Sequence, residues 1–156
     1  MLHELLAGAA KTMASVRYCW LVTTAGDGVH ARPMGRLPPE AGEDALTVRF
    51  LADGRSPKVS QIRQAAGVTA IFDDQPRDGY VAVTGQARLE GDPAVVRRRW
   101  KPGYAAYFPT EADRAHALFV EVAIERLELW IRGVTPEPFG LNATVLERDG
   151  GGWRLV

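Results

Sequence analysis

The chain of 156 residues is long enough to bury a sizeable core and too short for two ordinary domains. Its 19 lysines and arginines balance 19 aspartates and glutamates, which excludes an overall field that would attract nucleic acid or an anionic membrane, so we expect neither as a partner. The single cysteine excludes an intrachain disulfide and no apolar run approaches the ~20 residues of a membrane span, so we expect one soluble, unexported domain over residues 1–156 in the reducing cytoplasm.

The first half of the chain alternates between helical and β-like patterns. Apolar residues recur at helical spacing near the N-terminus, and a Gly-Asp-Gly turn signal separates two β-rich segments, which predicts a hairpin. A polar loop with proline and glycine follows, and then an alternating strand that runs into a helix. In chain order, the predicted elements are a helix over 2–16, strands over 18–25 and 29–37 with a turn at 26–28, a strand over 45–51 and a helix over 56–66.

The second half predicts a short apolar strand, a long strand, a helix opened by Asp92 and Pro93, another long strand and a final hairpin. Within the first long strand, Gly85 marks a place for a bulge or a close approach of two backbones. The predicted elements here are strands over 68–72 and 79–89, a helix over 92–100, a strand over 117–130 and a hairpin over 142–156.

The order of these elements predicts a mainly β fold. Six or so strands in antiparallel order with two short helices favour a β-barrel with flanking helices, because closure of a sheet removes its exposed edges. The sequence has no parallel βαβ repeat and no glycine-rich turn from strand to helix, so a Rossmann nucleotide site is not expected. Any nucleotide-like ligand must therefore be held by strands and the start of a helix.

A candidate phosphate site lies where the third strand runs into the following helix. Ser56 supplies a hydroxyl, Pro57 suits the first helical position, and Lys58 adds a positive charge beside the free N–H groups of the first turn. Arg32 and Arg36 lie on a strand that can pair nearby and supply two further cations. Together these groups predict a binding site for a phosphate.

The same residues also have a purely structural interpretation. Ser56 is a common helix cap, and short motifs of this kind are often caps and nothing more. Arg32 and Arg36 can instead pair with Asp53 or Glu40 at the surface. The residues alone leave both interpretations open.

Five motifs occur in the order seen in one family. They are Arg32-Pro33-Met34, Phe50–Asp53 leading to Ser56-Pro57-Lys58, Tyr80–Ala87, Trp100 followed by Tyr107-Phe108-Pro109, and Glu128–Trp130. From about residue 18 to residue 130 the chain resembles the FMN-binding split-barrel proteins related to pyridoxamine 5′-phosphate oxidase, and it is most similar to the general stress protein branch. The resemblance implies a six-stranded antiparallel split β-barrel, a homodimer, and two FMN sites at the subunit interface.

The resemblance also implies which residues bind the cofactor. Arg32, Ser56 and Lys58 would hold the FMN phosphate by charge-assisted hydrogen bonds. Trp130 would reach the flavin from the partner subunit. The other implied cofactor-binding residues are Pro33, Met34, Leu51 and Ala52 along the isoalloxazine, Tyr80 at a position that holds glutamine in the oxidase, and Trp100 with Phe108 over the ring. The apolar and aromatic members of this set suit a barrel core equally well.

Departures from the oxidase limit the activity that the resemblance implies. Pro57 stands where the oxidase has an arginine, and residues 136–140 lack the arginine-histidine motif that grips the oxidase's substrate, so vitamin B6 oxidation is not expected. His30 and His116 lack partners at ligand spacing, so we expect no metal site and no Ser-His-Asp hydrolase. With no catalytic side chain identified, any redox chemistry would rest on the flavin itself.

Three functions remain open at this stage. The first is a flavin-dependent oxidoreductase, linked to stress response, that uses FMN and exchanges electrons with a small-molecule donor or acceptor. The second is a flavin-binding or flavin-sequestering stress protein without turnover. The third uses the same barrel for haem or the deazaflavin F420, whose acidic groups would suit the same cations.

Overall fold

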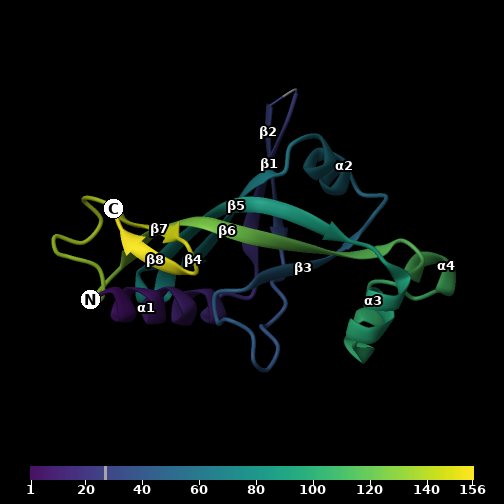
Figure 1. The fold of residues 1–156 in the computed structure, drawn as a ribbon, viewed down its shortest axis with the longest axis horizontal. Helices are drawn as coiled ribbons and strands as arrows, with labels where there is room; N and C mark the ends of the chain where they lie inside the picture. The colour runs from purple at the N-terminus through teal and green to yellow at the C-terminus, as the bar shows by residue number, and fades with distance from the viewer. Residues whose placement is uncertain (27) are drawn as a thin grey trace.

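The computed structural model describes residues 1–26 and 28–156, and this part of the chain forms one antiparallel sheet of eight strands with helices around it (Figure 1). The turn predicted at 26–28 includes residue 27, which lies outside the described residues. The strands are β1 (Cys19–Ala25), β2 (Gly28–Met34), β3 (Val48–Asp53), β4 (Gly67–Asp74), β5 (Gly79–Glu90), β6 (Ala117–Ile131), β7 (Thr144–Asp149) and β8 (Gly152–Leu155). The helices are α1 (Leu2–Ser15), α2 (Pro57–Gln64), α3 (Pro93–Arg99) and α4 (Glu111–Arg114), with 3₁₀ turns η1 (Gln75–Arg77) and η2 (Pro102–Ala106). None of the helices in these described ranges has the length and apolar character that crossing a membrane requires.

The strands lie in the order β2-β1-β4-β5-β6-β7-β8, and β3 pairs with β6 outside this path. The first half of β6, 117–122, pairs with β3, and residues 126–129 pair with β7. Leu37 N donates to Arg49 O (2.9 Å), which brings the segment after β2 onto β3 although the sheet does not close. The arrangement confirms the antiparallel split barrel with flanking helices, and the C-terminal hairpin β7–β8 adds two strands to the six of the barrel.

The register of β5 against β6 shifts between Thr84 and Gly85. The two backbones approach closely there, since a Cβ on Gly85 would lie 2.1 Å from the carbonyl oxygen of Ala123. A larger residue fits this position only if the main chain shifts. The bulge or close approach predicted at Gly85 is therefore confirmed, and such an irregularity bends and twists the strand.

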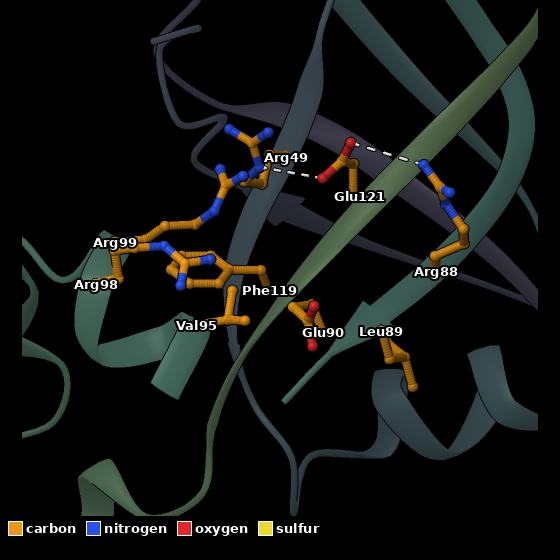
Figure 2. Close-up of a pocket in the computed structure, with 9 residues that line it drawn as sticks. All are labelled: Arg49, Arg88, Leu89, Glu90, Val95, Arg98, Arg99, Phe119 and Glu121. Atoms are coloured by element: carbon orange, nitrogen blue, oxygen red, sulfur yellow. Dashed lines mark hydrogen bonds and ion pairs between the residues drawn. The ribbon is translucent and has the colours of Figure 1, made fainter. Parts of the chain in front are cut away.

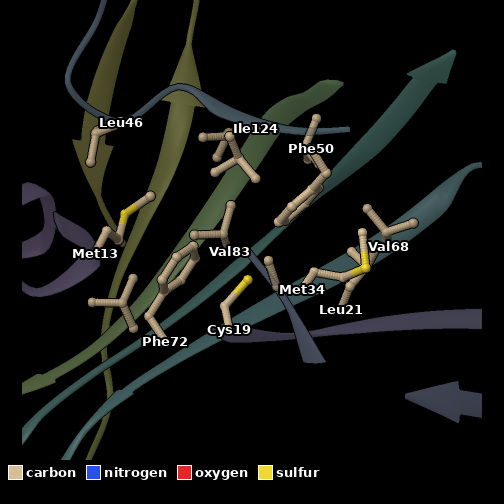
Figure 3. Packing of buried hydrophobic residues seen from close by; sticks show 14 of the residues in the cluster. Met13, Cys19, Leu21, Met34, Leu46, Phe50, Val68, Phe72, Val83 and Ile124 are labelled. Atoms are coloured by element: carbon tan, nitrogen blue, oxygen red, sulfur yellow. The ribbon is translucent and has the colours of Figure 1, made fainter. Parts of the chain in front are cut away.

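The inner face of the sheet packs around a buried cluster that includes Phe50 and Phe72 (Figure 3). Helix α1 covers one end of this cluster and buries Met13 in it. Cys19 is 1% exposed, and burial raises the pKa of its thiol to about 12, so the thiol stays protonated at neutral pH. Cys19 therefore acts as a small buried hydrophobe.

A second, smaller cluster lies on the other face of β3 and β6, below α3 and η2. Phe119 belongs to it, whereas its neighbours Leu118 and Val120 point into the main cluster. Val96 of α3 and Phe108 pack against Phe119 there. The second cluster therefore anchors the segment between β5 and β6 to the sheet. Helices α3 and α4 of this segment lie at the opposite end of the molecule from α1 (Figure 1).

The helix predicted over 92–100 is confirmed: α3 spans Pro93–Arg99, and the side chain of Asp92 caps it by accepting from Ala94 N (2.9 Å). The 3₁₀ turn η2 and helix α4 that follow were not predicted. They are five and four residues long, too short to show a helical repeat of apolar residues.

The strand predicted over 45–51 begins three residues later than expected, at Val48. The guanidinium of Arg36 donates to the carbonyl oxygens of Ala45 (2.7 Å) and Thr47 (2.9 Å). These carbonyls are therefore bonded to a side chain, and the segment before β3 forms a loop around Arg36.

Candidate functional site

A cavity of about 520 Å³ opens between the end of β2, the end of β3, the start of α2 and the η2 segment. Six residues predicted to bind a cofactor line it: Pro33, Met34, Leu51, Ala52, Lys58 and Phe108. A volume of this size is typical of small-molecule sites. The fold thus brings together three of the five motifs, which lie far apart in the sequence.

Lys58 lines this cavity at its α2 end, and Arg32, which does not line it, lies close enough for its charge to act on Lys58. We call these two residues the cationic pair. Arg32 donates to the carbonyl of Leu21 (3.0 Å), the hydroxyl of Thr23 (2.9 Å) and the amide oxygen of Gln61 (2.7 Å), all of which are neutral. Lys58 has no hydrogen-bond or ion-pair partner among the residues that the structure describes. Neutral groups therefore position Arg32, and Lys58 has no bonded partner among the described residues.

The electrostatics of the cationic pair are unfavourable without an anion. Burial lowers the pKa of Lys58, and the like charge of Arg32 lowers it further. Burial also lowers the pKa of Arg32. Both effects disfavour the charged forms, and an anion placed beside the two groups would relieve them.

The carboxylate of Asp53, which also lines the cavity, is engaged by another arginine. Arg55 donates to its two oxygens through Nε (3.0 Å) and Nη2 (2.7 Å). This hydrogen bonding lowers the pKa of Asp53 to about 2, so the group is ionised at neutral pH. Among the described contacts, neither Arg32 nor Arg36 pairs with Asp53 or Glu40, so the surface ion pairs considered as an alternative do not form.

Ser56 precedes α2 as predicted, with Pro57 at the first helical position. Its side chain makes no capping hydrogen bond, and its hydroxyl donates instead to the carbonyl oxygen of Asp53 (2.6 Å). Ser56 therefore tightens the turn that carries Lys58 and does not itself line the cavity.

Aromatic side chains of the η2 segment form one wall of the cavity. Tyr104 and Phe108 line it, and Trp100 packs edge-on against both rings, with centroids 5.4 and 6.0 Å away. Trp100 itself lines a neighbouring cavity, so it supports this wall from behind. Tyr107 and Tyr18, 73% and 53% exposed, lie at the rim.

Tyr80 and Trp130 do not line this cavity in their own chain. They pair across β5 and β6 and point away from the main core, because the next residue of β5, Val81, points into it. Trp20 and Ile71 pair across β1 and β4 on the same face and are 50% and 38% exposed. We call the surface formed by Trp20, Ile71, Tyr80 and Trp130 the outer sheet face.

The chemistry of the cavity is that of binding and orientation. Its lining contains no histidine, and its one carboxylate, Asp53, is ionised and paired. Burial raises the pKa of Tyr104, so its hydroxyl stays protonated. Within the described residues, no group of three or more His, Cys, Asp and Glu side chains is placed to hold a metal ion. The site suits a flat ring with an anionic tail, and its lining offers neither a histidine nor an unpaired carboxylate as a general acid or base.

Several lining residues were missed by the sequence analysis. Arg17 and Tyr18 precede β1, and no local pattern links them to β3. Tyr104 lies in the 3₁₀ turn η2, but the proline and glycine before it resemble a loop. Tyr107 stands in one of the five motifs but was not predicted to bind the cofactor. Gln61, which accepts from Arg32 and does not line the cavity, lies in the predicted helix over 56–66, where no local pattern indicates this contact.

Comparisons with known proteins identify a matching family and solved structures with a similar fold. The family model described as "Pyridoxamine 5'-phosphate oxidase like" matches residues 6–138. A search of curated proteins found no match to this sequence.

Solved structures that share the fold include the following three. A protein related to general stress protein 26 from Clostridium acetobutylicum has a TM-score of 0.75 at 15% identity, over 94% of this chain and 96% of that one. A pyridoxamine 5'-phosphate oxidase-related, FMN binding protein from Nostoc punctiforme has a TM-score of 0.68 at 17% identity, over 97% and 95% of the two chains. The general stress FMN/FAD binding protein from Xanthomonas citri has a TM-score of 0.64 at 22% identity, over 86% and 92%.

Proposed function

The chain belongs to the pyridoxamine 5'-phosphate oxidase-like family, and we propose that it binds FMN in the cavity between β2, β3, α2 and η2. One observation carries this proposal: Lys58 lines an aromatic-walled cavity with Arg32 close to it, and neither cation is hydrogen-bonded or ion-paired to a carboxylate among the described residues. A phosphate supplies the missing negative charge through charge-assisted hydrogen bonds. The likeness to folds described as FMN binding supports the choice of ligand.

The strand ends suit the flavin ring. Pro33 and Met34 offer apolar contact along one side of the cavity. The carbonyl of Arg49 accepts from Leu37 N, so the alternation of the strand places the N–H and C=O of Leu51 on the same edge of β3. The N–H of Leu51 can therefore donate a hydrogen bond to an isoalloxazine heteroatom, and its C=O can accept one from a ring N–H.

We further propose that the FMN-bound protein is an oxidoreductase that acts on a small-molecule donor or acceptor and belongs with the stress-related members of the fold. Bound FMN supplies hydride and electron transfer. The chain binds and orients the ring, and Tyr104 and Phe108 exclude water from one side of it. Tyr107 lies at the rim, where an incoming molecule would meet it. Because residues 136–140 lack the arginine-histidine motif of the oxidase, we do not propose a vitamin B6 substrate.

A second copy of the chain is the proposed partner for the outer sheet face. Trp20 and Ile71 expose apolar surface there beside the half-buried Tyr80 and Trp130, and an exposed apolar patch of this kind favours association. Trp130 points away from the cavity of its own chain. It would reach a flavin only in a dimer that places the outer sheet face of one copy beside the cavity of the other.

Replacement of Lys58 tests the position of the phosphate. Lys58→Ala is expected to weaken FMN binding about ten- to a hundredfold, or about 1.5–3 kcal/mol, because it removes one of two charges from a partly desolvated site. The dissociation constant is measured by quenching of flavin fluorescence. Arg63→Ala removes an exposed cation from the last turn of the same helix and is the matched control, with little expected change. Equal affinity of wild type and Lys58→Ala would place the phosphate elsewhere.

Reduction kinetics test the oxidoreductase proposal. We expect NADH or NADPH to bleach the visible flavin band of the FMN-loaded protein, and a small aromatic acceptor such as a quinone to restore it faster than oxygen does. Stopped-flow absorbance follows both steps. Failure of both nucleotides to reduce the flavin, with reoxidation by oxygen alone, would favour a protein that stores or senses FMN.

Charges placed on the outer sheet face test the dimer. The double variant Trp20→Glu, Ile71→Glu is expected to sediment as a monomer and to bind FMN about tenfold more weakly, because Trp130 of the other copy is lost from the site. Leu155→Glu on β8 changes a residue that is also 50% exposed and should leave the dimer intact. A wild-type monomer that binds FMN tightly would contradict the role given to Trp130.

A further inference from the structure

A second cavity, of about 330 Å³, lies between α3 and the strands β3, β5 and β6 (Figure 2). Four arginines, Arg49, Arg88, Arg98 and Arg99, line it, and we call it the arginine cavity. It shares no lining residue with the proposed flavin cavity. The two cavities can therefore hold separate ligands.

Two of the four arginines are neutralised by carboxylates. Arg49 donates to the two oxygens of Glu43 (3.0 and 2.5 Å), and its Nε donates to Glu121 (3.3 Å). Glu121 also lies 3.8 Å from Arg88, so it bridges the two arginines (Figure 2). Hydrogen bonding from Arg49 lowers the pKa of Glu43 to about 2, so this ion pair persists at neutral pH.

Of the other two arginines, both in the last turn of α3, Arg99 has one distant carboxylate partner and Arg98 has none among the described residues. Within the described part of the chain, Arg98 makes no hydrogen bond and no ion pair. Arg99 Nη1 is inaccessible to solvent and forms an ion pair with the Glu40 carboxylate at 3.9 Å, which is beyond hydrogen-bond reach, so it has no hydrogen-bond acceptor. A buried donor without an acceptor costs on the order of 1–3 kcal/mol. Arg98 is therefore the arginine of this cavity without a carboxylate partner among the described residues.

A structural role in the helix explains only part of this arrangement. Arg97, Arg98 and Arg99 form the last turn of α3, where cations interact favourably with the helix C-terminus. That role does not require two guanidinium groups to line one cavity. Because successive helical residues point about 100° apart, Arg97 lies on another side of the helix and lines a separate cavity beside Trp100.

We propose that the arginine cavity binds a small oxyanion, the phosphate or carboxylate group of a small molecule, through Arg98 and Arg99. Two guanidinium forks match the paired oxygens of either group. Leu89, Val95 and Phe119 also line the cavity and offer an apolar surface to the carbon skeleton of such a ligand. The volume is at the lower end of the range for small-molecule sites.

Calorimetric titration tests this site. The full chain is loaded with FMN, so that the proposed flavin site is filled, and titrated with inorganic phosphate and separately with malonate at constant ionic strength. We expect at least one of the two to bind at a single site. Arg98→Gln should weaken that binding about tenfold, because it removes an unpaired cation from the cavity. Arg88→Gln is a second variant at an exposed side chain of the cavity and should weaken it about threefold.

Arg97→Gln is the matched control, since it makes the same change of charge one residue earlier on α3, outside the arginine cavity. Its affinity should stay within about twofold of wild type. The same titration without FMN compares the two variants even if the flavin site fails to form. Binding of phosphate alone would identify a phosphorylated ligand, and binding of malonate alone a carboxylate ligand. No binding of either probe, or equal losses in Arg97→Gln and Arg98→Gln, would overturn the assignment.

Discussion

Arg32 and Lys58 repel each other at the start of α2, and the fold nevertheless holds them together. Neutral oxygens of Thr23 and Gln61 accept from Arg32, so its guanidinium is fixed without losing its net charge to a counter-ion. Asp53 is close enough to influence Lys58 but is bonded by Arg55. The result is an excess of positive charge in a half-buried place, where its energetic cost is offset only when an anion binds.

The split sheet places this charge beside a cavity. Strand β3 pairs with β6 on one edge, and on its other edge the Leu37–Arg49 hydrogen bond holds only the beginning of the strand. The end of β3 is therefore left facing the cavity. The second cluster, around Phe119, holds the η2 segment against the other face of β3 and so supplies the aromatic wall. The same cluster separates the proposed flavin cavity from the arginine cavity, since Phe119 lines the arginine cavity and its ring centroid lies 6.5 Å from that of Tyr104, which lines the other.

Local signals in the sequence predicted the elements and the phosphate-site residues that depend on near neighbours. Proline at the start of α2 and the close approach at Gly85 follow from backbone geometry, and both are found. The hydroxyl of Ser56 was predicted to bind the phosphate, but it donates to the carbonyl oxygen of Asp53 (2.6 Å), which the turn brings close to it. Tyr104 was not predicted, because it lines the cavity through the packing of a five-residue 3₁₀ turn, which is too short to show a repeat in the sequence. The alternation of residues along β6 predicts on which face of the sheet Trp130 lies. It does not predict whether Trp130 would contact the flavin of its own chain or that of a second copy.

The affinity ratio between FMN and riboflavin is the most direct measure of whether the cationic pair binds a phosphate. The two molecules share the isoalloxazine and the ribityl chain and differ only in the terminal phosphate. If Arg32 and Lys58 hold that phosphate, FMN should bind at least about a hundredfold more tightly than riboflavin, a difference of about 2.7 kcal/mol. Riboflavin binding as tightly as FMN, in fluorescence titrations of the same preparation, would contradict this assignment.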